Sequence, residues 1–392
     1  MSPDRFLKTI AATLLSSLFL PGPWAWGDEF RFTPSLGVKD EYNSNIFFST
    51  SDRTDSFILT VSPRLEVSER TERLDALLDA GVSQLIYSSD RELDTLDQRY
   101  RGALGYRISE GFRLSGDASW SREGRPDRFI QETGLVSVLE RSDHLIGSAT
   151  MDFAISEKNA GRLLYLYDQI KFQSQSNLDS KQQTVGFGFI HDLAQYFSGT
   201  KARVNLGYSL NNFTGSDVEN YMLTVGFSKE VHELWSVIVD VGGRYTRSMF
   251  DAPGAETSND TGWIGKIAME YKGERNTGTI SFYQDVTVGA GVGGAAERTA
   301  LTMDLAHRGS YEFTGLFSGG YYWNRAEAGQ FSGPAIDERT VFVRPTLRYA
   351  VTRNIDVDAA YQYTRVLYRQ TDTVASQNVV YLLVALRYPV VE

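Results

Sequence analysis

The sequence contains no cysteine, only four histidines and fewer basic than acidic residues. The absence of cysteine excludes disulfides, thiolate metal sites and a lipid-modified N-terminal cysteine, and it suits a protein that passes through an oxidising compartment. Lys and Arg together number 39 against 49 Asp and Glu, so the formal net charge is −10. No basic stripe exists that could neutralise phosphates, which argues against nucleic acid as a partner.

Long apolar runs are missing as well. After residue 27, no apolar segment approaches the roughly 20 residues that a membrane-spanning helix needs. The chain is nevertheless 42% hydrophobic and contains 21 Tyr and 22 Phe. These residues are distributed over short, interrupted segments, which excludes a helical membrane protein.

The N-terminus has the pattern of a secretory signal. Arg5 and Lys8 provide positive charge, and the apolar run over residues 9–20 is too short to span a bilayer. Residues 25–27 then offer a small-x-small cleavage site. We therefore expect residues 1–27 to be a cleaved signal peptide.

The remaining chain, residues 28–392, repeats one unit about eighteen times: alternating apolar and polar side chains, closed by turn residues. In one clear copy, Val341, Val343 and Leu347 occupy alternate positions, and Arg344 and Arg348 occupy the others. A side-chain period of two is typical of a β-strand with one face in apolar and the other in polar surroundings. The segments run about 11 to 15 residues, enough to cross a membrane at a tilt of about 45°.

The connections between these segments alternate between short and long. Short turns are expected at 68–72, 109–111, 156–159, 272–276 and 352–354, and long loops at 43–54, 88–94, 124–141, 173–181, 248–260, 288–297 and 325–338. This alternation is typical of outer-membrane barrels, whose short turns face the periplasm and whose long loops face outside. The sequence therefore predicts an all-β fold: a single antiparallel up-and-down transmembrane β-barrel of about 18 strands, with 16 as the alternative.

A secreted soluble β-sandwich or β-helix is the competing interpretation. Such folds have strands of about five or six residues and fewer apolar side chains facing outward. The length of the repeated segments favours the barrel, which places the protein in the outer membrane of a Gram-negative bacterium, in contact with its lipids. The last segment supports this: Val380, Leu382, Val384, Leu386 and Tyr388 resemble the C-terminal signal that barrel-assembly machinery reads.

If the apolar positions face lipid, the other positions line the interior. The charged candidates for this lumen-facing set are Arg99, Arg101, Arg107, Arg113, Arg203, Arg244, Arg344, Arg348, Asp117, Asp240, Asp356 and Asp358. Such a wall is hydrated and mixed in sign, and a barrel of this size leaves an aqueous channel unless loops fold inward. The apolar stretches within loop 124–141 could fold into the channel and plug it.

Four of these arginines, at positions 99, 101, 107 and 113, fall on consecutive strands and should cluster on one wall. One hypothesis makes them an anion-guiding ladder for acidic sugar chains. The alternative is that they pair with nearby carboxylates such as Asp97 and Asp117 and stiffen the barrel. A change in ion selectivity after substitution of Arg99 and Arg101 separates the two hypotheses.

Catalytic patterns are sparse. Asp143-His144 and His191-Asp192 would suit a barrel hydrolase only if a nucleophile and a base converged from different strands. Asp251, Glu256 and Asp260 fall in one loop and could bind calcium, but a solvated acidic loop is the favoured interpretation. We expect no enzyme activity, no cofactor and no metal.

The end of the first segment carries a recognisable stretch, Lys39-Asp40-Glu41-Tyr42-Asn43-Ser44-Asn45-Ile46-Phe47. It is similar to the opening of a family of outer-membrane β-barrel porins associated with exopolysaccharide and capsule export, although an Asp is common in that family where Ser44 stands. The resemblance implies secretion of a polysaccharide beside a periplasmic polysaccharide export lipoprotein. A general or substrate-selective diffusion porin is the alternative function, and an outer-membrane hydrolase is the third.

Overall fold

The structure, a computed structural model, describes residues 29–126, 140–173, 179–251, 257–289, 294–331 and 335–390. The expected signal peptide and the apolar stretches of loop 124–141 lie outside the described residues. Within them the chain forms eighteen strands and one short 3-10 helix, η1 (Arg91–Leu93). The strands are β1 (Glu29–Asn43), β2 (Ser56–Arg70), β3 (Leu74–Tyr87), β4 (Thr95–Ser109), β5 (Phe112–Glu123), β6 (Ser142–Ser156), β7 (Asn159–Phe172), β8 (Ser180–Asp192), β9 (Thr200–Phe213), β10 (Ser216–His232), β11 (Trp235–Phe250), β12 (Ser258–Lys272), β13 (Asn276–Gly289), β14 (Gly294–Arg308), β15 (Phe313–Ala326), β16 (Ile336–Ala350), β17 (Ile355–Tyr368) and β18 (Thr373–Arg387).

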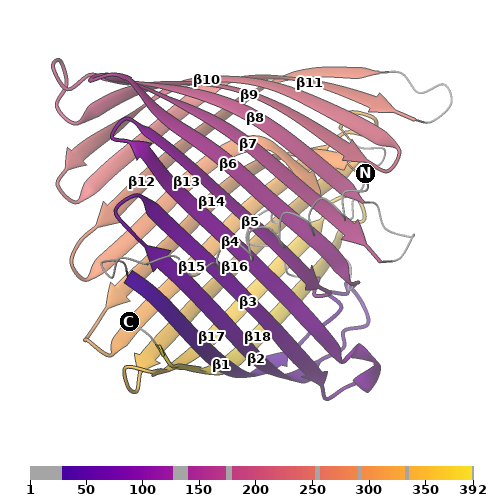
Figure 1. Cartoon of the computed structure of the whole chain (residues 1–392). Coiled ribbons are helices and arrows are strands. Elements are labelled where there is room, and N and C mark those ends of the chain that lie inside the picture. The colour runs from indigo at the N-terminus through magenta and orange to yellow at the C-terminus, as the bar shows by residue number, and fades with distance from the viewer. Residues whose placement is uncertain are drawn as a thin grey trace, which may run out of the picture.

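The strands form one closed antiparallel sheet in which each strand pairs with its neighbours in sequence (Figure 1). Closure is made by β1 and β18, which pair from Ser35 with Arg387 to Asn43 with Val379. The prediction of a single up-and-down barrel is confirmed, with eighteen strands, and the alternative of sixteen is wrong. Closure gives every strand two partners, so no sheet edge is left at the ends of the chain.

The wall has two chemically different faces because side chains alternate along each strand. Phe57 is 58% exposed on the outside, whereas its neighbour Ile58 is 1% exposed on the inside. The same alternation continues around the ring. Apolar side chains exposed on the outside include Leu36, Leu59, Leu78, Leu104, Leu163, Phe187, Leu206, Val225, Val241, Ile267, Phe282, Leu301, Tyr321, Leu347, Tyr361 and Leu382.

This continuous apolar surface explains the fold class. Soluble monomers rarely expose contiguous apolar patches larger than a few hundred Å², whereas here the outer faces of all strands are apolar. A closed ring satisfies its backbone hydrogen bonds between strands, which hydrocarbon requires of any spanning structure. The chain is therefore a transmembrane β-barrel. Among the described residues, no helix is long and apolar enough to cross a membrane.

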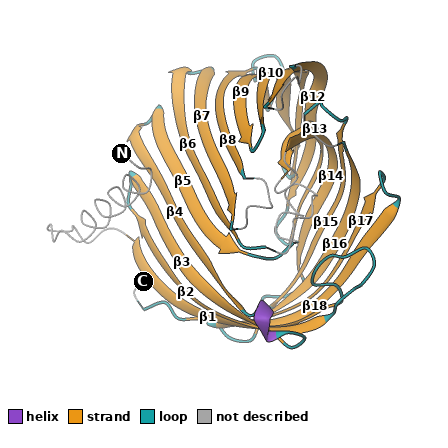
Figure 2. Ribbon diagram, turned by 90° about the vertical axis from the view of Figure 1, so that its right-hand side faces the viewer, coloured by secondary structure: helices purple, strands orange, loops and turns teal. Residues whose placement is uncertain are grey.

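The two ends of the barrel differ. At one end, the turn end, the strands are joined by residues 71–73, 110–111, 157–158, 193–199, 233–234, 273–275, 309–312 and 351–354. The other end, the loop end, carries the longer connections, including 44–55 and 124–141. The described chain begins and ends at the turn end, because Glu29 of β1 pairs with Arg70 at the end of β2 and β18 runs to Arg387 beside β1. Figure 2 shows β2 to β8 and β12 to β17 on opposite sides of the ring. Short turns at one end and longer loops at the other match the expected division between periplasmic and extracellular sides.

Connections at both ends depart from the expected alternation: residues 193–199 form a longer connection at the turn end, and residues 369–372 form a short one at the loop end. Only Thr214 and Gly215 join β9 to β10, and Gly215 has a φ of 94°, which favours glycine. The sequence pattern predicts a strand over residues 219–229 here. The strand instead begins at Ser216, because Val218 extends the alternation and is fully buried on the inner side.

The assignment of the two faces can be tested, because a charged side chain should be costly on the outer face and tolerated on the inner face. Leu382 is 50% exposed on the outside of β18, so Leu382→Arg should destabilise the barrel by about 2–4 kcal/mol if it lies near the bilayer midplane. The matched change Leu383→Arg places the same charge on the inner face opposite Asp358, and we expect a much smaller effect. Urea unfolding in lipid vesicles measures both, and equal losses would contradict this assignment of faces.

Candidate functional site: the inner wall

The sequence-predicted lumen residues lie at inner-face positions of their strands. On β4, Leu96, Tyr100 and Leu104 are exposed outside, and Arg99 and Arg101 occupy the alternate positions. The same alternation places the other ten candidates on the inner side: Arg107, Arg113, Arg203, Arg244, Arg344, Arg348, Asp117, Asp240, Asp356 and Asp358. The inner wall therefore carries charges of both signs.

The arginines of β4 are matched by carboxylates on β5. Arg99 Nη2 lies 2.7 Å from Glu123 Oε1, and Arg101 Nε lies 2.8 Å from Asp117 Oδ2. Both arginine side chains are more than half exposed, so each pair contributes about 0–1 kcal/mol to stability. The pairs therefore fix where charge lies on the wall more than they stabilise the fold.

Two further ion pairs span an intervening strand. Arg113 of β5 reaches Asp75 of β3 at 3.4 Å, and Arg203 of β9 reaches Asp240 of β11 at 2.6 Å. In both cases the strand between has a glycine at the crossing point. A Cβ on Gly105 would lie 2.9 Å from Arg113 Nη2, and one on Gly226 would lie 2.3 Å from Asp240 Oδ1. The missing side chains allow the ion pairs to lie flat against the wall.

The opposite side of the ring repeats the pattern. Arg348 of β16 binds Asp358 of β17 through two hydrogen bonds of 2.8 and 2.7 Å, and Asp356 pairs with Arg387 of β18. Two candidates differ: within the described part of the chain, Arg107 and Arg344 have no ion-pair partner. Ten of the twelve candidates thus have a partner of opposite charge, and Arg107 and Arg344 are the two that do not have one among the described residues.

The first loop, residues 44–55, is held to the inner wall by Asn45, which is fully buried. Its Nδ2 donates to Ser49 O at 2.8 Å and Ser376 O at 3.1 Å, and its Oδ1 accepts from Ser49 N at 2.9 Å. Gln377 Nε2 donates to Asn45 O at 2.9 Å. One side chain therefore closes the loop on itself and ties it to β18.

This anchoring places Phe48 inside the barrel. Phe48 has a φ of 54°, a conformation that a bulky residue adopts only when its surroundings hold it there. Its ring packs on the inner faces of β15 to β18, against Tyr322, Phe342, Val366 and Ala375. Loop 44–55 therefore narrows the interior at the loop end.

A second connection also enters the interior. Glu41, 2% exposed on the inner face of β1, binds Lys39 at 2.6 Å and Arg125 at 2.8 Å. Arg125 follows β5, four strands away from β1 in the ring. The described start of loop 124–141 is thus directed across the interior toward β1, while its middle lies outside the described residues.

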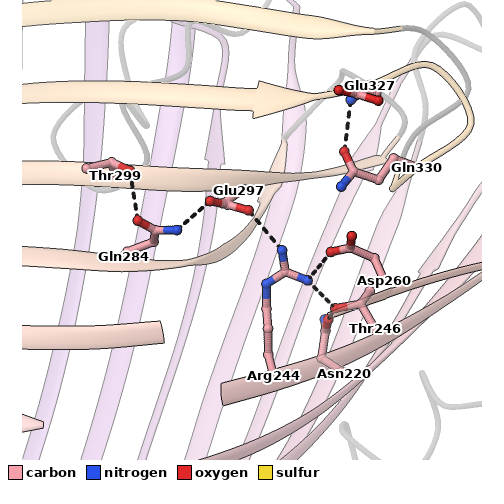
Figure 3. Close-up of polar contacts among 9 residues, drawn as sticks. All are labelled: Asn220, Arg244, Thr246, Asp260, Gln284, Glu297, Thr299, Glu327 and Gln330. Atoms are coloured by element: carbon pink, nitrogen blue, oxygen red, sulfur yellow. Dashed lines mark hydrogen bonds and ion pairs between the residues drawn. The ribbon is translucent and has the colours of Figure 1, made fainter. Parts of the chain in front are cut away.

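Arg244 is the centre of a group of polar side chains at the loop end (Figure 3). Its side chain is 2% exposed and binds Asp260 at 2.6 Å and Glu297 at 2.9 Å. Its Nη1 also donates to Thr246 at 3.0 Å, and its guanidinium lies 4.9 Å from the ring of Phe331. Two carboxylates and an aromatic face thus compensate this buried charge.

The histidines belong to separate pairs. His144 lies 2.8 Å from Asp168, and His191 lies 2.8 Å from Asn159, at the loop end and the turn end respectively. The structure does not bring the two histidines together. In residues 29–126, 140–173, 179–251, 257–289, 294–331 and 335–390, no group of three or more His, Asp or Glu is placed to hold a metal ion.

Sequence reasoning did not single out several wall residues. These include the pairs Arg64–Asp79, Arg162–Asp152 and Arg298–Asp285, and the loop side chains Phe48, Arg125 and Phe331. The strand pairs obey the same alternation as the predicted set, so applying it to every strand would have found them. The loop residues give no comparable signal, because their position depends on contacts distant in sequence.

No family model matches this chain, and no curated protein matches it either. Among solved structures, Pseudomonas aeruginosa OccK2 (OpdF) is 11% identical with a TM-score of 0.48, over 93% of this chain and 100% of that chain. Pseudomonas aeruginosa OpdO is 12% identical with a TM-score of 0.46, over 92% and 98%. Acinetobacter baumannii OccAB4 is 9% identical with a TM-score of 0.44, over 92% and 98%.

The role of Asn45 can be tested by proteolysis. Asn45→Ala leaves buried hydrogen-bonding groups of the loop and of β18 without partners, at a cost of about 1–3 kcal/mol. Loop 44–55 should then detach, and trypsin should cleave after Arg53 faster than in the unsubstituted protein. Thr50→Ala, at an exposed position of the same loop, is the matched control. Equal cleavage rates for the two variants would show that Asn45 does not hold the loop.

Proposed function

We propose that this protein is an outer-membrane channel through which small polar solutes diffuse passively. The observation that carries the proposal is the combination of a closed eighteen-stranded wall, an apolar exterior and a charged interior. Rings of this size are wide enough to enclose an aqueous channel. Charged side chains on the inner wall keep that channel hydrated and bias which solutes enter.

The charges on the inner wall are arranged in pairs of opposite sign. This favours selection of solutes by local ion pairs over selection by a uniform electric field of one sign. Arg99, Arg101 and Arg113 each have a carboxylate partner, so an anion-guiding ladder would depend on the exposed guanidinium edges of these pairs. A solute with both donor and acceptor groups can hydrogen-bond to both partners of such a pair. This supports a general or substrate-selective diffusion porin.

Export of an exopolysaccharide is the other function to be tested. It comes from the resemblance at residues 39–47, and the comparisons with known proteins give that association no support. In the structure, Asn45 and Ile46 of this stretch have buried folding roles in the first loop. The inward position of Phe48 and Arg125 favours small solutes over a polymer. A polysaccharide export lipoprotein as a partner accordingly belongs to the export hypothesis alone.

Ion selectivity tests the contribution of the wall. In Arg99→Gln/Arg101→Gln, Glu123 and Asp117 lose their counter-charges, so the interior gains two net negative charges. Reversal potentials in planar bilayers at low salt should shift toward cations. The shift should diminish near 1 M salt, where the Debye length falls to about 3 Å.

The matched variant Asp117→Asn/Glu123→Gln should shift the reversal potential toward anions. An unchanged reversal potential in both double variants would exclude a role for this wall in selectivity. Failure of the unsubstituted barrel to conduct ions at all would contradict the open diffusion channel.

Deletion of the gene separates the two transport functions. Loss of small-solute uptake, with unchanged surface and secreted polysaccharide, is expected for a diffusion porin. Loss of polysaccharide with unchanged uptake would instead support export. Complementation with the intact chain controls for secondary effects of the deletion.

A further inference from the structure

The backbone ladder between β12 and β13 ends about halfway along the two strands. Strands β12 and β13 pair only between Gly265–Lys272 and Gln284–Thr277. Both strands continue toward the loop end, β12 to Ser258 and β13 to Gly289. In these described extensions no backbone pair joins the two strands, whereas β12 stays paired with β11 and β13 with β14 along their lengths. The wall is therefore split from mid-height upward.

Beside the split, the described ends of β13 and β14 (the β13–β14 hairpin) bend into the barrel. Ala295 and Ala296 at the start of β14 are fully buried against Phe213 and Val218 of β9 and β10. Those strands lie three or more positions from β13 in the ring. Contact with their inner faces is possible only if the hairpin lies inside the wall. Phe331 joins the same apolar cluster and accepts a hydrogen bond from Ala295 N at 3.2 Å.

A polar group lies directly beside this split (Figure 3). Glu297 of β14 has the same parity as Leu301, which is exposed outside, yet it faces Arg244 on the inner side of β11. Asp260 on the inner side of β12 binds the same guanidinium, and Gln284 of β13 hydrogen-bonds to Glu297. Arg244 thus connects both sides of the split. A Cβ on Gly262 of β12 would lie 2.7 Å from Arg244 Nη2, so β12 has no side chain where the guanidinium lies.

An interrupted ladder is costly in a bilayer, because unpaired backbone groups in hydrocarbon cost several kcal/mol each. Here the split opens onto an apolar cluster inside the barrel, bordered by the charged group around Arg244. A pathway lined by apolar and charged groups side by side suits a molecule that has both.

We propose that the split between β12 and β13 is a lateral gate through which amphipathic molecules pass between the bore and the outer leaflet. Arg244 is the latch: its bonds to Asp260 and Glu297 hold the β13–β14 hairpin inside the wall. Withdrawal of the hairpin from the inner faces of β9 and β10 uncovers the apolar cluster. The tail of the solute then crosses the wall along Val218 and Val286, with its polar head near Arg244.

A disulfide tether tests this gate, since the chain has no cysteine of its own. Val218→Cys/Ala296→Cys joins the hairpin to β10, and Val218→Cys/Ala295→Cys is the second pairing if the first does not oxidise. Cells producing each protein are exposed to N-phenylnaphthylamine, an amphipathic dye that fluoresces in the membrane interior. The oxidised tether should abolish the dye entry that the barrel adds over cells lacking it, and reduction of the same sample should restore it.

Ion conductance of the same tethered protein in planar bilayers distinguishes a lateral from an axial path. Retained conductance with lost dye entry supports the lateral gate. Loss of both would show that the hairpin closes the bore itself, and unchanged dye entry would show that no solute uses the split; either result overturns the proposal. Glu297→Gln, which keeps the shape of the side chain, should raise dye entry several-fold, and no increase would exclude the latch.

Discussion

Hydrocarbon offers no partner to a backbone N–H or C=O group, and the rest of this structure depends on that constraint. It requires each strand to have two neighbours, which eighteen antiparallel strands achieve by pairing β1 with β18. It also fixes the outer face, because a strand paired on both edges can still meet lipid only with apolar side chains. Between β12 and β13 this rule is broken, because both strands continue toward the loop end beyond their last pair, Gly265 with Gln284.

The inner face does not meet hydrocarbon, so it can carry charged side chains. Its charges are neutralised locally, between adjacent strands as in Arg348–Asp358 or across a glycine as in Arg203–Asp240. Local neutralisation permits a charged, hydrated wall without strong repulsion within the ring. Removal of one member of such a pair leaves its partner uncompensated, so a single substitution changes the electric field inside the barrel.

The loop end adds a layer that the wall alone does not have. Phe48, Arg125 and Phe331 reach the interior from three different connections, and the β13–β14 hairpin bends inward beside them. Buried polar residues fix two of these segments: Asn45 holds the first loop, and Arg244 holds the hairpin. The loop end therefore narrows the interior, while the wall sets the charge that lines it.

The sequence by itself determined the class of the fold, because alternation with a period of two is a local property of the chain. It predicted the number of strands and assigned side chains to the two faces from neighbours such as Leu347 and Arg348. Strand ends were less accurate where turn residues and alternation overlap, as at Ser216. Register, in contrast, is set by backbone pairing between strands.

Only the tertiary structure decided which opposite charges meet and which segments enter the barrel. The contact between Arg244 and Glu297 joins residues 53 positions apart. It places Glu297 toward the interior, although Glu297 has the parity of outward-facing Leu301. Alternation assigns Glu297 to the outside, and only the inward bend of the hairpin changes what that face contacts. Such a bend depends on packing between distant strands, which no local pattern in the sequence records.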